Sequence, residues 1–110
     1  MANKYFRQAL IPDSGASTSI YVVPAANVAL LKSLRVTNDS GSRANIFIRQ
    51  FSAGDATAHL LINGFVLPNG ASFDLFNGIT CVLQAGDALE VEASEDDVCF
   101  YLSYLEVDRN

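Results

Sequence analysis

The chain contains no tryptophan, a single histidine and only two cysteines. A Ser–His–Asp arrangement would depend entirely on His59, and no G-x-S-x-G nucleophile motif occurs in the sequence. A structural zinc site needs about four Cys or His ligands, whereas the chain has three such residues in total. No glycine-rich phosphate loop is present either. We therefore predict that the protein is not an enzyme and has no metal or other cofactor.

Basic residues are scarce, with seven Lys and Arg against twelve Asp and Glu and a net charge of −5. Neutralising a phosphate backbone needs clustered Lys and Arg, so we expect no nucleic-acid partner. No apolar run is long enough to cross a bilayer and no signal peptide precedes the first strand. We therefore expect no membrane partner and synthesis in a cytoplasm.

Acidic residues gather near the end of the chain, where Glu90 and Glu92 are followed by an acidic turn at residues 95–97. Paired carboxylates occur in glycosidases, and an acidic cluster can bind calcium. The preferred interpretation is a solvated acidic edge. The missing tryptophan also weakens a sugar-binding interpretation, although Tyr and Phe could stack on sugar faces.

Short alternating runs separated by turn residues make up most of the chain. The clearest stretch, residues 67–91, contains LPNG and AGD turns between runs in which apolar and polar side chains alternate. Eight or nine such runs occur at a spacing of about ten residues, and none has a helical period. We predict one all-β domain over residues 1–110, an antiparallel β-sandwich of jelly-roll-like or Ig-like type. A small closed barrel is the alternative.

Several strands have features that predict their place in the sheets. Residues 5–11 form either a first strand or an extended arm, within a possible N-terminal arm at residues 1–12. Lys32 interrupts the apolar residues of the strand at 28–37, which favours an edge strand or one that ends at a subunit boundary. The strand at 59–62 is expected to end at Asn63-Gly64. Cys81 and Cys99 are expected to be buried thiols, and they could form a disulfide only if their strands pair.

Two strands, at residues 44–51 and 98–107, are apolar on both faces. A strand of this kind is covered on both sides, and in a chain of 110 residues the second cover is often another copy. We therefore predict a homo-oligomer, with a trimer favoured, whose subunit interface contains Phe47, Phe51, Tyr101 and Leu105.

Charge is distributed unevenly along the chain. Residues 1–55 contain six basic and three acidic residues, a net charge of +3, whereas residues 56–110 contain one basic and nine acidic residues, a net charge of −8. The simplest interpretation is a set of solvated strand faces and loops. The alternative is a dipolar subunit whose basic side meets an acidic neighbour.

Four segments resemble small virion structural proteins of tailed bacteriophages, of the head decoration or cement type. They are VVP at residues 22–24, LKSLRVTN at 31–38, LPNG at 67–70 and VLQAGDAL at 82–89. The resemblance covers roughly residues 20–93 and consists of turn and strand patterns. It implies a capsid decoration protein on the outer head surface that stabilises the shell, with no catalytic residues. A tail or neck component, or a module that binds a host-surface glycan or protein, is the alternative.

In that setting the partners would be further copies of the chain and the major capsid protein, and the location would be the virion after synthesis in the host cytoplasm. The uneven charge then predicts which residues contact acidic loops of the capsid. These candidate contacts are Lys4, Arg7, Arg35, Arg43 and Arg49.

Overall fold

The structure is a computed structural model that describes residues 3–108 and contains nine strands and no helix within that range. No described helix is therefore long and apolar enough to cross a membrane. The strands are β1 (Asn3–Leu10), β2 (Thr18–Val22), β3 (Asn27–Asn38), β4 (Ala44–Ser52), β5 (Thr57–Leu67), β6 (Ser72–Asp74), β7 (Cys81–Leu83), β8 (Ala88–Ala93) and β9 (Val98–Asp108).

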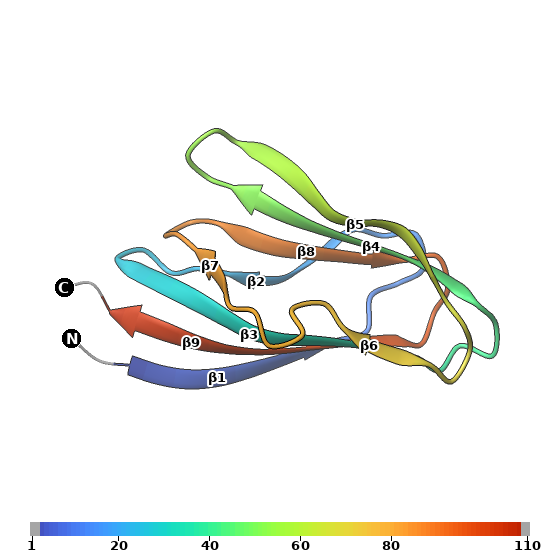
Figure 1. Cartoon of the computed structure of the whole chain (residues 1–110). Helices are drawn as coiled ribbons and strands as arrows, with labels where there is room; N and C mark the ends of the chain where they lie inside the picture. Colours follow the sequence, from blue (N-terminus) through green and yellow to red (C-terminus); the bar gives the residue numbers. More distant parts are fainter. Residues whose placement is uncertain (1–2, 109–110) are drawn as a thin grey trace.

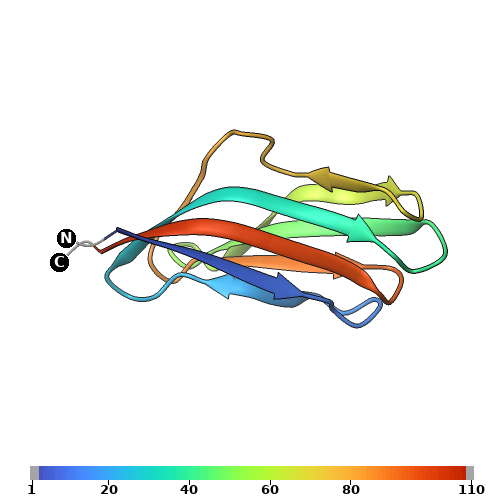
Figure 2. The same ribbon diagram turned by 90° about the horizontal axis from the view of Figure 1, so that it is seen from below.

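Two antiparallel sheets pack face to face, which confirms the predicted β-sandwich. Sheet A has the order β1-β9-β3-β6, with β7 also paired to β3, and sheet B has the order β2-β8-β4-β5. Sheet A is the lower layer in Figure 1 and faces the reader in Figure 2. The flank formed by β1 and β2 is thus opposite the flank formed by β5, β6 and β7.

The hydrophobic core lies between the two sheets and follows the period of two in each strand. On β9, Phe100 and Leu102 are fully buried, whereas Tyr101 between them is exposed on the other face. β8 and β4 repeat the pattern with Val91 and Ile48. Each large apolar side chain buried in this way stabilises the fold by about 1.5–3 kcal/mol relative to exposure.

Lys32 lies inside the central strand β3, so the predicted edge position is wrong. β3 pairs with β9 on one side and with β6 and β7 on the other. Its register with β9 shifts between Leu31 and Ser33, which makes Lys32 the extra residue of a β-bulge. The bulge shifts the alternation of inward and outward side chains by one residue. As a result, Leu31 before it and Leu34 after it both point into the core. The apolar pattern of this strand is therefore interrupted without a sheet edge.

Strand β5 does not end at Asn63-Gly64 as predicted but continues to Leu67. Its register with β4 shifts there, because Phe47 pairs with Asn63 while Ile46 pairs with Phe65. Gly64 is the unpaired residue, and its φ of 75° is one that a residue without a Cβ adopts readily. The Asn-Gly pair thus forms a bulge within one long strand.

Residues 3–10 form β1, an edge strand that pairs with β9 along its whole length. The sequence left open whether this segment is a strand or an extended arm. Residues 3–10 form a strand. Residues 1–2 of the proposed arm lie outside the described residues.

Cys81 and Cys99 do not pair with each other. Both are free, partly buried thiols in strands that pair with β3, but Cys81 is opposite Leu31 and Cys99 is opposite Thr37. At about 3.3 Å per residue these positions are about 20 Å apart along β3. The separation excludes an internal disulfide.

The fully buried side chain of Asn38 connects the turn that follows β3 to the end of β5. Its Nδ2 donates to the backbone oxygens of Ser42 and Leu67 at 2.7 and 2.9 Å, and its Oδ1 accepts from the Ser40 N–H at 3.0 Å. The adjacent turn at Pro68–Ala71 contains Gly70 with a φ of 81°, as the sequence predicts. The loops at this end of the sandwich are therefore fixed by hydrogen bonds.

Replacing Asn38 with Ala is expected to lower the free energy of unfolding by about 2–3 kcal/mol, because buried backbone groups lose their partners. Urea unfolding measures the effect. The matched control is Asn45→Ala, whose exposed side chain takes part in no described hydrogen bond and which should change stability by less than about 0.5 kcal/mol. Equal losses in both variants would contradict the structural role of Asn38.

Candidate interaction surfaces

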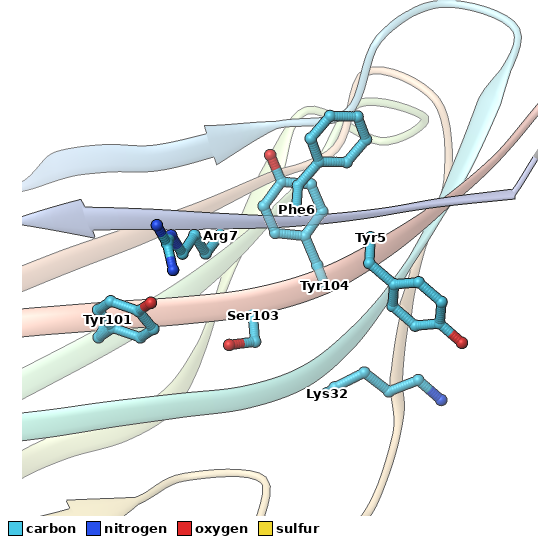
Figure 3. A pocket seen from close by; sticks show the side chains of 7 residues that line it. All are labelled: Tyr5, Phe6, Arg7, Lys32, Tyr101, Ser103 and Tyr104. Carbon is cyan, nitrogen blue, oxygen red and sulfur yellow. The ribbon is translucent and has the colours of Figure 1, made fainter.

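The outer face of sheet A, the face turned away from the core, combines aromatic and basic side chains from three strands. β1 contributes Tyr5 and Arg7, which the register places opposite Leu105 and Ser103 of β9. β9 also contributes Tyr101. These residues and Lys32 of β3 line a groove of about 630 Å³. In Figure 3 the side chains of Tyr5, Ser103, Tyr101 and Lys32 spread across this face, while the Phe6 and Tyr104 rings lie together on the other side of the strands.

Three cations on this face, Arg7, Lys32 and Arg35, are exposed. We refer to the outer face of sheet A around these three residues as the basic face. None of them has a carboxylate within 4.0 Å in the described part of the chain. Among residues 3–108, the one hydrogen-bond acceptor of the Lys32 side chain is the Thr80 hydroxyl, at 3.2 Å. These cations are therefore available to an acidic partner without breaking an internal ion pair.

Asp74, the cross-strand neighbour of Arg35, is occupied by other donors. Its carboxylate accepts hydrogen bonds from the Ser33 hydroxyl at 3.0 Å and from the N–H groups of Leu34 and Phe76 at 3.1 Å each. Burial acts to raise the pKa of Asp74, but these hydrogen bonds outweigh it and lower the pKa below its ordinary value. This carboxylate holds the segment after β6 rather than neutralising the basic face.

The outer face of sheet B contains an internal ion pair. Arg49 Nη1 lies 3.1 Å from Glu92 Oε1, and its guanidinium lies 5.9 Å from the centre of the Phe47 ring. Phe47 and Phe51 are partly buried on this face. Glu92, one of the paired carboxylates of the sequence, is therefore an ion-pair partner across the β4–β8 ladder.

A phenol–carboxylate cluster closes the end of the sandwich near the start of β1. Tyr21 donates its hydroxyl proton to Glu106, and its ring lies 4.2 Å from that of Tyr104. Burial, followed by the contact with Glu106, raises the pKa of Tyr21 far above its ordinary value. Tyr21 thus stays a neutral donor that fixes β2 to β9.

The predicted interface residues do not form one surface. Phe47 and Phe51 lie on the outer face of sheet B, and Tyr101 and Leu105 lie on the outer face of sheet A. Leu105 is only 9% exposed, because its cross-strand neighbours Tyr5 and Leu30 flank it. Leu105 is therefore covered within the subunit and has little surface to offer a partner.

The predicted capsid contacts are also divided. Arg7 and Arg35 share the outer face of sheet A, whereas Arg49 lies on the opposite face in its ion pair. Arg43 is exposed in the turn before β4, and Lys4 is at the sheet edge opposite Glu106. Lys32 also lies on the outer face of sheet A, although the sequence did not predict it as a contact.

The described residues show no group of three His, Cys, Asp or Glu side chains that could hold a metal ion. His59 is half-exposed on β5, with its Nε2 3.8 Å from an oxygen of Asp55. This arrangement is typical of a surface histidine on an edge strand.

No protein-family model matches the chain, and no curated protein matches its sequence. The fold is similar to that of a chain from the Bacillus endospore appendages, a family of disulfide-linked pili, with a TM-score of 0.59 at 12% identity. That match covers 99% of this chain and 88% of the other.

The fold is also similar to part of a chain in T=1 particles of infectious bursal disease virus, with a TM-score of 0.58 at 8% identity. A chain of the T13 particle of the same virus gives a TM-score of 0.55 at 11% identity. Each match covers 94% of this chain but only 31% and 30% of the viral chains. At such identities these similarities show the fold alone.

Proposed function

We propose that the protein is a structural component of a tailed-bacteriophage virion that binds the outer surface of the head and stabilises the shell. The observation that supports this most is the basic, aromatic outer face of sheet A. Its cations Arg7, Lys32 and Arg35 have no described carboxylate partner, and Tyr5 and Tyr101 beside them are exposed.

The basic face is suited to docking on acidic loops of the major capsid protein. Charge complementarity contributes mainly to the association rate and to the orientation of docking, while Tyr5 and Tyr101 supply apolar contact area. A subunit that binds the assembled lattice and not the free capsid protein stabilises the shell by mass action. The long paired strands and fixed turns of the sandwich provide a stiff clamp for this task.

The fold similarities are compatible with this role, because the same fold occurs in chains of viral particles and of pili. The number of subunits remains a prediction. We keep the trimer as the favoured assembly, with Phe47, Phe51 and Tyr101 in subunit contacts.

The experiment compares phage heads with and without the protein. Heads are purified from a strain in which the gene is disrupted and from the same strain complemented with it, and both are heated in parallel. We expect the complemented heads to contain the protein in many copies and to release DNA at a temperature several degrees higher. A protein found only in tails, or heads of equal heat resistance, would exclude this function.

The same preparation distinguishes the host-binding alternative. The groove beside Tyr5 and Tyr101 could stack on a sugar face, and a host-binding module would change adsorption to cells. For a head decoration protein we expect adsorption rates to be equal in the two strains.

A further inference from the structure

A row of apolar side chains crosses four strands on the outer face of sheet A, at the end where β1 begins. The register places Tyr5 of β1 opposite Leu105 of β9, Leu105 opposite Leu30 of β3, and Leu30 opposite Val82 of β7. Residues directly opposite each other in antiparallel strands lie on the same face, with Cβ atoms about 5 Å apart. These four residues therefore form one continuous surface, which we call the apolar row.

The two ends of the apolar row are exposed to solvent. Tyr5 is 79% exposed and Val82 is 53% exposed, whereas Leu30 is partly buried and Leu105 is buried between them. Three strand spacings separate the two ends, which corresponds to roughly 14 Å. An apolar side chain of a partner that lies between Tyr5 and Val82 would remove both of them from water.

The bulge in β3 places a cation at the border of the apolar row. Two residues, Lys32 and Ser33, separate the core residues Leu31 and Leu34, where regular alternation would leave only one. The exposed Lys32 side chain lines the same groove as Tyr5 (Figure 3). Bulges often re-aim a side chain next to a functional site. The strand thus presents Lys32 on the outer face, two residues after the apolar row.

The other cations follow the apolar row at regular distances along the strands. Arg7 lies opposite Ser103, two residues along from the row. Arg35 lies opposite Tyr101, four residues from Leu105. At about 3.4 Å per residue, these two positions are about 7 Å and 14 Å from the apolar row. Side chains on one face of an extended chain repeat at the same distances, at positions i, i+2 and i+4.

We propose that the apolar row and the basic face together bind an extended segment of the major capsid protein, in which an apolar residue alternates with acidic residues at every second position. This proposal rests on the proposed function and specifies the chemistry of its partner. The apolar side chain covers the apolar row, one carboxylate lies beside Arg7 and Lys32, and a second lies beside Arg35. None of the three cations has a carboxylate within 4.0 Å in the described part of the chain, so the partner supplies the complementary charge.

The same face of a second copy would be a poor partner. Two outer faces of sheet A related by a two-fold axis would bring the cations Arg7, Lys32 and Arg35 of both copies together. Like charges that meet in an interface are unfavourable. The neighbouring Asp74 carboxylate cannot compensate, because three donors of its own subunit already occupy it. The charge of this face therefore favours an acidic segment of a different chain.

The first test measures binding to heads from the strain in which the gene is disrupted, by co-sedimentation. We expect Val82→Ser to weaken binding about tenfold, because the variant has less apolar area to bury against the partner. Leu60→Ser is the matched control, since Leu60 is 52% exposed and lies opposite Arg49 on the outer face of sheet B. It should bind within about twofold of the native chain. Circular dichroism confirms that both variants fold.

Salt separates the apolar contact from the charged contacts. Raising the ionic strength from 0.1 M to 1 M shortens the screening length from about 10 Å to about 3 Å. The difference between the native chain and Lys32→Ala should therefore disappear, whereas the difference between the native chain and Val82→Ser should persist. A Val82→Ser effect that vanishes with salt would contradict the apolar contact.

A photo-crosslinker at position 82 identifies the segment that is bound. We expect Val82→p-benzoylphenylalanine to crosslink to the capsid protein, in a segment that mass spectrometry shows to carry acidic residues two and four positions from an apolar one. The same crosslinker at position 60 should give no such product.

The outcomes distinguish this proposal from the proposed function. A crosslink to a segment without these acidic residues, or equal binding of Val82→Ser and Leu60→Ser, would overturn the proposal and leave the head location intact. Heads that do not bind the native chain at all would exclude the proposed function, and this partner with it. Self-association of the native chain without heads, weakened by Val82→Ser, would assign the apolar row to a second copy and overturn the proposal.

Discussion

Replacing Phe100 with Ala is expected to lower the free energy of unfolding by about 3–5 kcal/mol. Phe100 is fully buried in β9, opposite Leu10 of β1 and Val36 of β3, so its ring fills the core where three strands of sheet A meet. This loss is a large part of the about 5–15 kcal/mol that a domain typically has. Urea unfolding followed by circular dichroism measures it.

Tyr101→Ala is the control for this prediction. Tyr101 follows Phe100 in the same strand but is 37% exposed on the outer face of sheet A. We expect its replacement to cost about 1 kcal/mol or less. A larger loss for Tyr101 than for Phe100 would mean that β9 packs with the opposite parity, and the description of the outer face would then be wrong.

Reversing the charge of the basic face is expected to remove the protein from phage heads. In a variant with Arg7→Glu, Lys32→Glu and Arg35→Glu, attraction to acidic capsid loops becomes repulsion at three positions. Three exposed pairs of about 0.2–1 kcal/mol each, together with the added repulsion, correspond to a loss of affinity of about 100-fold. Binding to heads stripped of the native protein, measured by co-sedimentation, provides the affinity.

A second variant with Lys4→Glu and Arg43→Glu is the matched control. Both residues are exposed cations, but neither lies on the outer face of sheet A. This variant should bind within about threefold of the native protein at moderate salt, because long-range charge effects are screened. Equal losses in both variants would indicate that net charge, and not the basic face, determines binding.

Local alternation in the sequence was enough to predict the sandwich and most of its strands. The strand at residues 98–107 was predicted to be apolar on both faces, and Phe100 and Tyr101 do lie on opposite faces of β9. The turn at Gly70 was also predictable, because its position after Pro68 and Asn69 favours a positive φ.

The two errors have a common physical cause. Lys32 in an apolar run and Asn63-Gly64 in a strand were interpreted as a sheet edge and a strand end, but both mark bulges within long strands. A bulge and a turn use the same residues, and only the pairing partner, which is distant in sequence, distinguishes them.

The grouping of site residues could not be predicted for a related reason. Phe47 and Tyr101 were each expected to face away from the core, and they do, but nothing local indicates that β4 and β9 belong to different sheets.

The most direct test of the proposed function is an image reconstruction of purified heads by electron cryomicroscopy, at a resolution that separates the two sheets. We predict density for this sandwich on the outside of the shell, with Arg7, Lys32 and Arg35 turned toward the capsid protein. Density at the tail or neck, no density on the head, or a sandwich docked with the outer face of sheet B on the shell would contradict the account.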